Sequence, residues 1–299
     1  MTAPFPSPTS KWHDNIYDSL SPSRPELSAK GKVVLITGGG TGIGAETARF
    51  FAAAGASRIA LLGRRAQPLA ETKASLERQF PNLAVFVAPT DVTKKSDVDA
   101  AFAGFLSRGE KVDVVVSNAA TAGPRESVAD VDGEAFVDAV SQNVKGALFV
   151  AQAFLRYAAK DAVAVNISSA AAIFNFGPGY SSYSTAKSAT VRLWDSLASA
   201  NPDLSVFHIQ PGVVDTDMNR EAGGVKAAGF EDHVSLPGSF ILWLASPEAR
   251  FLKGRFLFSN WDIDELKARR NEFESGEQFK VGLGGWPFGN GGWEAGWGL

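Results

Sequence analysis

The sequence predicts one α/β domain built on a seven-stranded parallel sheet with helices on both faces. From Lys32 onward, short apolar and β-branched runs alternate with segments of helical periodicity, as in parallel sheets that are covered on both sides. A glycine-rich turn separates the first run from the first helical segment. A chain of 299 residues with 45% apolar content can bury a sizeable core. These observations favour a doubly wound fold of Rossmann type.

Each strand is assigned to a short apolar run, and each helix to the periodic segment that follows. Strands are expected near residues 32–37, 58–62, 83–87, 112–117, 162–168, 204–209 and 255–259. The first helix, 43–54, places Ile43, Thr47, Phe50, Phe51 and Ala54 on one stripe. The later helices are expected near 66–79, 94–107, 134–158, 182–199 and 236–246.

The two ends of the chain differ in composition from the central domain, which we place at residues 31–262. Residues 1–30 are rich in proline and contain neither a signal-peptide apolar core nor an Arg-rich amphipathic pattern, so we expect an irregular N-terminal arm. Residues 263–299 are expected to form a C-terminal helix and a Gly/Trp-rich tail. The tail carries Trp286, Trp293 and Trp297, and either covers its own domain or contacts another subunit.

Composition excludes several classes of function. The formal net charge of −3 gives no electrostatic reason to expect nucleic acid or anionic lipid as a partner. The chain has no cysteine, and its three histidines show no metal-ligand spacing, so we expect no metal. No apolar run approaches the roughly 18 residues of a membrane span. We therefore expect a cytoplasmic protein that binds small molecules and no membrane.

The glycine-rich turn has the form expected for a dinucleotide site. It follows strand 32–37 and opens the first helix, where free backbone N–H groups and the positive end of the helix dipole favour a pyrophosphate. In another context such a turn is only a loop. The candidate binding residues are Thr37, Gly38, Thr41, Gly42, Ile43 and Gly44.

The end of the second strand bears on the choice of coenzyme. No Asp or Glu lies between Arg58 and Ala70, whereas Arg64 and Arg65 follow the strand directly. A carboxylate here binds the ribose 2′-hydroxyl of NAD, and an arginine suits the 2′-phosphate of NADP. The sequence predicts NADP(H), contacted by Arg64 first and Arg65 second. The alternative is that both arginines are solvated at a helix start.

A tyrosine and a lysine predict proton transfer. Tyr183 and Lys187 are four residues apart, so a helix places them one turn apart on one face. A nearby cation is expected to lower the tyrosine pKa from about 10 by about 1 to 3. Tyr180 has Ser184 at the equivalent position and gains no cation. Taken alone, the pair could equally be an ordinary half-buried tyrosine and its lysine neighbour.

Both motifs, TGxxxGxG at Thr37–Gly44 and YxxxK at Tyr183–Lys187, resemble those of short-chain dehydrogenases/reductases, and the resemblance covers about residues 30–260. It implies that Ser169 hydrogen-bonds the reacting oxygen and that Tyr183 is the general acid or base. Lys187 then holds the nicotinamide ribose, and Asn143 supports a water-linked proton path. Ser168 is the competing serine. Tyr183 follows Ser169 by 14 residues, one more than is commonest in the family, which implies an insertion between 170 and 180.

The resemblance also implies further coenzyme contacts. Asp91 with Val92 is expected near the adenine, and Asn118 with Ala119 near the nicotinamide. The Asn118 segment reads SNAA where the family has NNAG, so this loop is expected to differ in detail. The segment after the sixth strand contributes Pro211, Gly212, Val214 and Thr216.

The substrate is expected to be a small-molecule carbonyl compound or alcohol. Phe174, Phe176 and Phe230 suggest an apolar or aromatic pocket, although core packing is an equal alternative. Residues 217–236 lie where relatives carry a mobile lid. We expect an NADP(H)-dependent carbonyl reductase or alcohol dehydrogenase. The alternatives are a redox-neutral epimerase, dehydratase or cyclase, and a non-catalytic NADP(H)-binding protein. By resemblance, the subunits form a homodimer or homotetramer.

Overall fold

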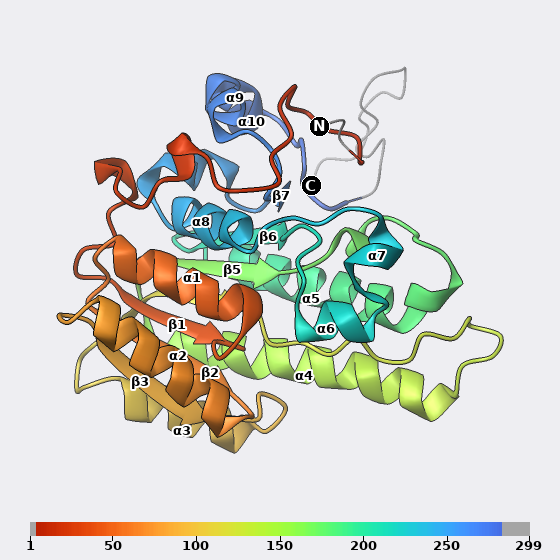
Figure 1. Cartoon of the computed structure of the whole chain (residues 1–299), viewed down its shortest axis with the longest axis horizontal. Coiled ribbons are helices and arrows are strands. Elements are labelled where there is room, and N and C mark those ends of the chain that lie inside the picture. The colour runs from red at the N-terminus through yellow and green to blue at the C-terminus, as the bar shows by residue number, and fades with distance from the viewer. Residues whose placement is uncertain (1–3, 283–299) are drawn as a thin grey trace.

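A parallel sheet forms the centre of the molecule. The computed structural model describes residues 4–282, and within them seven parallel strands form one sheet in the order β3-β2-β1-β4-β5-β6-β7 (Figure 1). The strands are β1 (Val33–Thr37), β2 (Arg58–Gly63), β3 (Ala84–Pro89), β4 (Val112–Ser117), β5 (Ala158–Ile167), β6 (Ser205–Gln210) and β7 (Phe256–Phe258). The fold class predicted from the sequence is confirmed.

The strand order reverses beside β1. Val33 in β1 lies opposite Arg58 in β2, while Val34 pairs with Val114 of β4 on the other side. The chain therefore leaves β1 in one direction and returns to its opposite edge. The connections after β1 and β4 diverge at the carboxyl ends of these strands, which is where open α/β sheets bind ligands.

Helices cover both faces of the sheet. Helices α1 (Gly42–Ala53), α2 (Ala66–Gln79) and α8 (Ser235–Leu244) pack on one face, and α3 (Lys95–Phe105), α4 (Gly133–Tyr157) and α5 (Ser181–Ala200) on the other. The shorter helices are α6 (Asp217–Glu221), α7 (Gly224–Ala228), α9 (Ile263–Ala268) and α10 (Arg270–Ser275). All six helices predicted for the central domain are present, with ends within two residues of the prediction. The largest difference is at β5, which begins at Ala158, directly after α4, rather than at 162.

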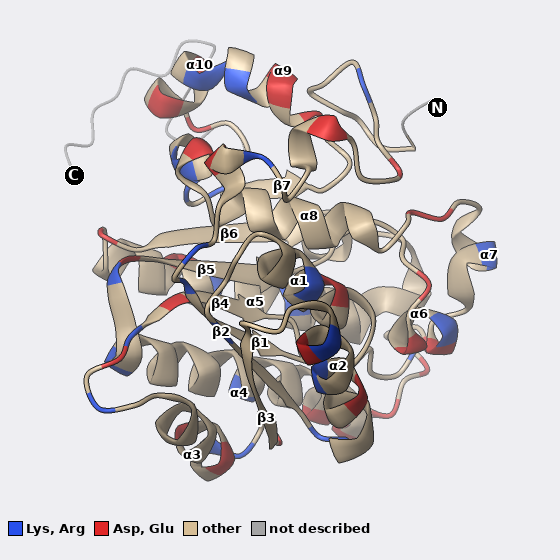
Figure 2. Cartoon of the chain, turned by 60° about the vertical axis from the view of Figure 1, so that its left-hand side comes forward, with Lys and Arg blue, Asp and Glu red and all other residues tan. Residues whose placement is uncertain are grey.

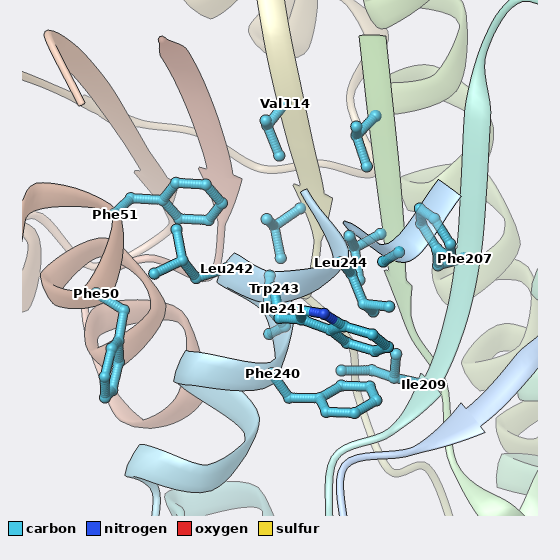
Figure 3. Close-up of a cluster of buried hydrophobic side chains, with 14 of the residues drawn as sticks. Phe50, Phe51, Val114, Phe207, Ile209, Phe240, Ile241, Leu242, Trp243 and Leu244 are labelled. Atoms are coloured by element: carbon cyan, nitrogen blue, oxygen red, sulfur yellow. The ribbon is translucent and has the colours of Figure 1, made fainter. Parts of the chain in front are cut away.

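The strands alternate their side chains between two cores. Val34 and Ile36 join a cluster with α1 and α8, while Val33 and Leu35 face α3, α4 and α5. Figure 3 shows part of the first cluster, where the side chains of α8 lie between Phe50 and Phe51 of α1 and Phe207 and Ile209 of β6. Each large side chain buried in this way contributes about 1.5–3 kcal/mol of hydrophobic stabilisation, which fixes the helices on the sheet.

The N-terminal arm is packed onto the domain. It has two short 3₁₀ turns, Asp18–Leu20 and Pro25–Leu27, and is otherwise irregular. Leu20 and Leu27 are fully buried within the first core cluster. Trp12 pairs with Trp261 in an isolated antiparallel bridge. In Figure 1 the red arm runs between α8 and α9, and hydrogen bonds join it to both helices.

The C-terminal region holds two short helices, α9 and α10, where one was predicted. The chain leaves helical geometry at Arg269 (φ −102°, ψ 19°), which separates them. The tail tryptophans, Trp286, Trp293 and Trp297, lie outside the described residues. In Figure 2 the charged residues gather on outer helices and loops, and the strands carry few. Among the helices of residues 4–282, none has the length and apolar character that a membrane crossing requires.

Candidate active site

A cleft of about 930 Å³ opens at the carboxyl ends of the central strands. Gly38 after β1, Asn118 after β4, Ser169 after β5 and Gly212 after β6 all line it. The structure therefore brings together residues that are far apart in the sequence. The predicted site residues that line the cleft are Gly38, Thr41, Gly42, Ile43, Arg64, Arg65, Val92, Asn118, Ala119, Ser169, Phe176, Tyr183, Lys187, Pro211, Gly212, Val214, Thr216 and Phe230.

The glycines of the first turn are required by close backbone approach. A Cβ atom at Gly44 would lie 2.2 Å from the Gly38 carbonyl oxygen, and one at Gly38 (φ +66°) would lie 2.6 Å from Nδ2 of Asn118. Gly44 therefore allows α1 to pack tightly against the end of β1, and it is not among the described residues that line the cleft. The structure thus gives Gly44 a packing role, and its contact with the coenzyme stays a prediction.

Thr37 has a supporting role as well, because its side chain is buried behind the cleft. Its Oγ1 atom accepts hydrogen bonds from the backbone N–H groups of Asn118 (2.9 Å) and Ala119 (3.0 Å). The Asn118 side chain donates in return to the Thr37 carbonyl at 2.9 Å. This reciprocal pairing fixes the loop after β4 against the glycine turn.

One end of the cleft suits an anion. It includes the start of α1, where the N-cap residue Thr41 makes no side-chain capping hydrogen bond within the described chain. Free helical N–H groups and the helix dipole favour negative charge at such a point. Arg64 and Arg65 lie at the same end. Arg65 forms an exposed ion pair with Asp217 (2.9 Å), whereas within residues 4–282 Arg64 forms none.

The Asp91 side chain is directed to its own loop. Its Oδ1 atom accepts from the Thr93 hydroxyl (2.7 Å) and backbone N–H (3.0 Å), and these bonds, with nearby Arg64, hold the pKa of Asp91 below its usual range. Val92 lines the cleft, but Asp91 is not among the described residues that do so. The contact of Asp91 with adenine stays a prediction.

Tyr183 and Lys187 lie on α5 beside the end of β5, whereas Arg64 follows β2, three strands away in the sheet. Lys187 is buried, its Nζ atom lies 5.5 Å from the centre of the Tyr183 ring, and it donates to the Ile167 carbonyl at 2.8 Å. Burial lowers the pKa of Lys187 to about 8. The helix thus brings the two side chains together, as their spacing predicted.

The net direction predicted for the pKa of Tyr183 is wrong. Burial raises the pKa of Tyr183 to about 12, and the opposing interaction with the Ser169 hydroxyl is weaker. A nearby cation lowers the pKa of a phenol, whereas the loss of water around the phenol raises it. In this structure desolvation is the larger effect, so the phenol stays protonated at neutral pH.

Asn143 lies behind the wall of the cleft. Its side-chain amide donates to the carbonyls of Thr121 (3.0 Å) and Ala139 (2.9 Å), and its Oδ1 atom accepts from the Thr121 N–H at 3.2 Å. These bonds hold the segment after β4 against α4. The role of Asn143 in a water-linked proton path stays a prediction.

Comparison with known proteins places this geometry in a family. Residues 32–225 match the family model described as short chain dehydrogenase. The chain belongs to the short-chain dehydrogenase/reductase family. It is 33% identical over 284 residues to a short chain dehydrogenase/reductase of Claviceps purpurea, covering 93% of this chain and 95% of the relative.

Two further comparisons agree. The short chain dehydrogenase/reductase AacuD of Aspergillus aculeatus is 32% identical over 282 residues, covering 93% of this chain and 97% of the relative. A solved short-chain type dehydrogenase/reductase from Mycobacterium ulcerans superposes with a TM-score of 0.71 and 26% identity, covering 77% of this chain and 89% of the other. Members of the short-chain dehydrogenase/reductase family are oxidoreductases that bind a nicotinamide coenzyme.

The residues present fit such a coenzyme. The glycine turn leaves the backbone accessible, the start of α1 faces the cleft, and the cleft extends from Arg64 to Tyr183. The segment after β6 is held in place by Asp232, whose Oδ2 atom accepts from the Val213 N–H at 2.7 Å. Gly212 (φ +93°) is needed there, because a Cβ atom would lie 2.7 Å from that oxygen.

The short-chain dehydrogenase/reductase motifs do not account for every residue of the cleft. Phe176 and Phe230 line it, but Phe174 is not among the described residues that do. Phe5, Tyr180 and Arg125 line it without having been predicted as binding residues. Tyr180 precedes Tyr183 by one helical turn, which could have indicated its position. Phe5 lies in the irregular arm, where no pattern in the sequence links it to the cleft.

Proposed function

We propose that this protein is an NADP(H)-dependent reductase of ketones or aldehydes, and that the reverse reaction oxidises a secondary alcohol. A medium-sized apolar or aromatic substrate is favoured. The observation that carries the proposal is that Ser169, Tyr183 and Lys187 line one cleft with the glycine turn. A protein that only bound the coenzyme would not need this proton-transfer group.

The preference for NADP(H) rests on charge. Within the cleft the residues directly after β2 are Arg64 and Arg65, and no carboxylate occupies the end of that strand. Arg65 is already paired with Asp217, so Arg64 is the better candidate for the 2′-phosphate.

The protein's residues act mainly by position. When bound, the nicotinamide coenzyme exchanges hydride with the substrate carbon. The Ser169 hydroxyl and the Tyr183 phenol both face the cleft and can hydrogen-bond the substrate oxygen. Because burial keeps Tyr183 protonated, it is suited to donate its proton as negative charge develops on that oxygen. The protonated phenol is the form that a general acid in carbonyl reduction requires.

A panel of aliphatic and aromatic carbonyl compounds, assayed with NADPH and with NADH, tests the proposal. We expect net oxidation of the reduced coenzyme, faster at low concentrations of NADPH than of NADH. Conversion of a compound without any net change in coenzyme would indicate redox-neutral chemistry. Preference for NADH would overturn the assignment to Arg64.

We also propose a homodimer or homotetramer. The exposed residues Val137, Leu148 and Leu155 are spaced by 11 and 7 residues on α4, which places them along one face of that helix. An apolar stripe of this kind suits contact with a second copy of the chain. Light scattering should give the mass of at least two subunits, and a monomer at micromolar concentration would contradict it.

A further inference from the structure

The N-terminal arm is fixed firmly where it passes the sheet edge. The backbone N–H of His13 donates to the Asn260 carbonyl at 2.9 Å, and the Asn260 side chain donates to the His13 carbonyl at 2.8 Å. The His13 ring also pairs with buried Asp262 at 2.8 Å. Nearer the start of the arm, Arg269 donates to the carbonyl of Pro8 at 3.1 Å. The arm therefore has one defined path over β7 and α9.

This path carries Phe5 into the cleft wall, where it lies with Phe176 and Phe230. The ring of Phe5 is parallel to that of Phe174, with centroids 6.4 Å apart and an interplanar angle of 2°. It meets Phe176 (5.9 Å) and Phe230 (6.2 Å) edge to face. These are favourable arrangements for aromatic pairs. We call Phe5, Phe174, Phe176 and Phe230 the aromatic wall.

The aromatic wall lies at the substrate end of the cleft. Phe176 contacts the ring of Tyr180 with centroids 6.0 Å apart, and Tyr180 is one helical turn before Tyr183. Arg64 and the start of α1 lie at the other end, which suits the coenzyme phosphates. Phe174 and Phe176 remain 40% and 41% exposed, although they are large apolar residues. Of these two, Phe176 lines the cleft. Exposed aromatic surface at a cleft is typical of a site that buries it on binding an apolar ligand.

We propose that Phe5 is a specificity-determining residue, and that the N-terminal arm provides one wall of the substrate pocket for the ring of a planar aromatic carbonyl compound. This inference rests on the proposed function and adds the substrate class. An aromatic ring in the ligand can stack on, or meet edgewise, the rings already gathered there. A small aliphatic ketone reaches Ser169 and Tyr183 without needing the aromatic wall.

Two variants, Phe5→Ala and Phe5→Leu, test the proposal. Phe5→Ala should raise the KM for 1-naphthyl methyl ketone by about 5- to 20-fold, with kcat little changed, since ring contact and apolar burial are both lost. Phe5→Leu should recover part of the effect. The KM for butanone and the Kd for NADPH should be unchanged in both variants.

Ile16→Ala is the matched control, because Ile16 packs on the core from the same arm and is not among the described residues that line the cleft. Ile16→Ala should leave the KM for both ketones unchanged. A rise in the KM for 1-naphthyl methyl ketone equal to that in Phe5→Ala would indicate a structural role for the arm and overturn the proposal.

Calorimetric titration of the coenzyme-bound protein with 1-naphthyl methyl ketone separates the two proposals. If the ketone binds and Phe5→Ala weakens it, the pocket assignment stands even where no carbonyl is reduced. Equal binding by the wild type and Phe5→Ala, or no preference of the wild type for the naphthyl ketone over butanone, would overturn it.

Discussion

Replacement of Lys187 by Met should make the protein more stable and inactive. Lys187 is 5% exposed, and burial lowers the pKa of its ammonium group from 10.5 to about 8. At pH 7 this difference corresponds to a cost of about 3 kcal/mol for keeping the charge in the folded state. Methionine has a similar length and carries no charge.

The stabilisation expected from removing this charge is reduced by the loss of one hydrogen bond. Lys187 donates to the Ile167 carbonyl at 2.8 Å, and losing that bond costs about 1–2 kcal/mol. The net stabilisation of Lys187→Met should therefore be about 1–2 kcal/mol at pH 7, or a rise in Tm of about 2–6 °C. Turnover should fall by about 10²-fold or more, because the proton-transfer group loses its cation.

The pH dependence identifies the cause. Because the folded pKa lies below the unfolded value, the cost is fully present below pH 8 and disappears as the pH rises towards 10.5. The stability difference between Lys187→Met and the wild type should thus shrink by about 2 kcal/mol between pH 7 and 9.5. Urea denaturation of the coenzyme-free proteins measures this, with exposed Lys30→Met as the control. A less stable variant at pH 7, or a difference that does not change with pH, would refute the reasoning.

Three further predictions concern neighbouring groups. Tyr183→Phe should reduce turnover by about 10² to 10⁴-fold without weakening NADPH binding, whereas Tyr180→Phe, in the same cleft, should retain most of it in the same assay. Arg64→Ala should raise the Kd for NADPH by about 10-fold or more and leave the Kd for NADH unchanged. Arg65→Ala should raise the Kd for NADPH less, because Arg65 is paired with Asp217. Burial raises the pKa of Asp232 to about 6, so its contribution to stability is lost as the pH rises through that value. The free energy of unfolding of Asp232→Asn, relative to that of the wild type, should rise by about 1 kcal/mol between pH 5 and 7.5 in urea denaturation.

These predictions fail in distinct ways. Unchanged turnover in Tyr183→Phe would remove the phenol from its role. Equal losses for NADPH and NADH in Arg64→Ala would mean that the arginine contacts a phosphate common to both coenzymes. A pH-independent difference between Asp232→Asn and the wild type would show that its carboxylate is not destabilised by burial.

Local pattern was enough to predict the strands, the six longer helices and the two motifs, because these depend on residues close in sequence. The short helices α6 and α7 were not predicted. The start of β5 was misplaced because Ala158 and Ala159 lack the β-branched character that marks a strand. The predicted direction of the Tyr183 pKa shift was wrong because desolvation depends on what surrounds the phenol in space. Phe5 was missed for the same reason, since its place in the cleft is set by contacts between His13 and Asn260, 247 residues apart.

The Asn260 side chain also links two segments that are far apart in the sequence. Its amide donates both to the His13 carbonyl and to Oδ1 of buried Asp232, each at 2.8 Å, and the other oxygen of Asp232 holds the Val213 N–H. One side chain thus links the N-terminal arm to the segment after β6, which lines the cleft. A replacement of residues 1–30 must keep the hydrogen bond of the arm to Asn260, because Asn260 also binds Asp232. Within the family, changes at positions 13, 232 and 260 should therefore occur together.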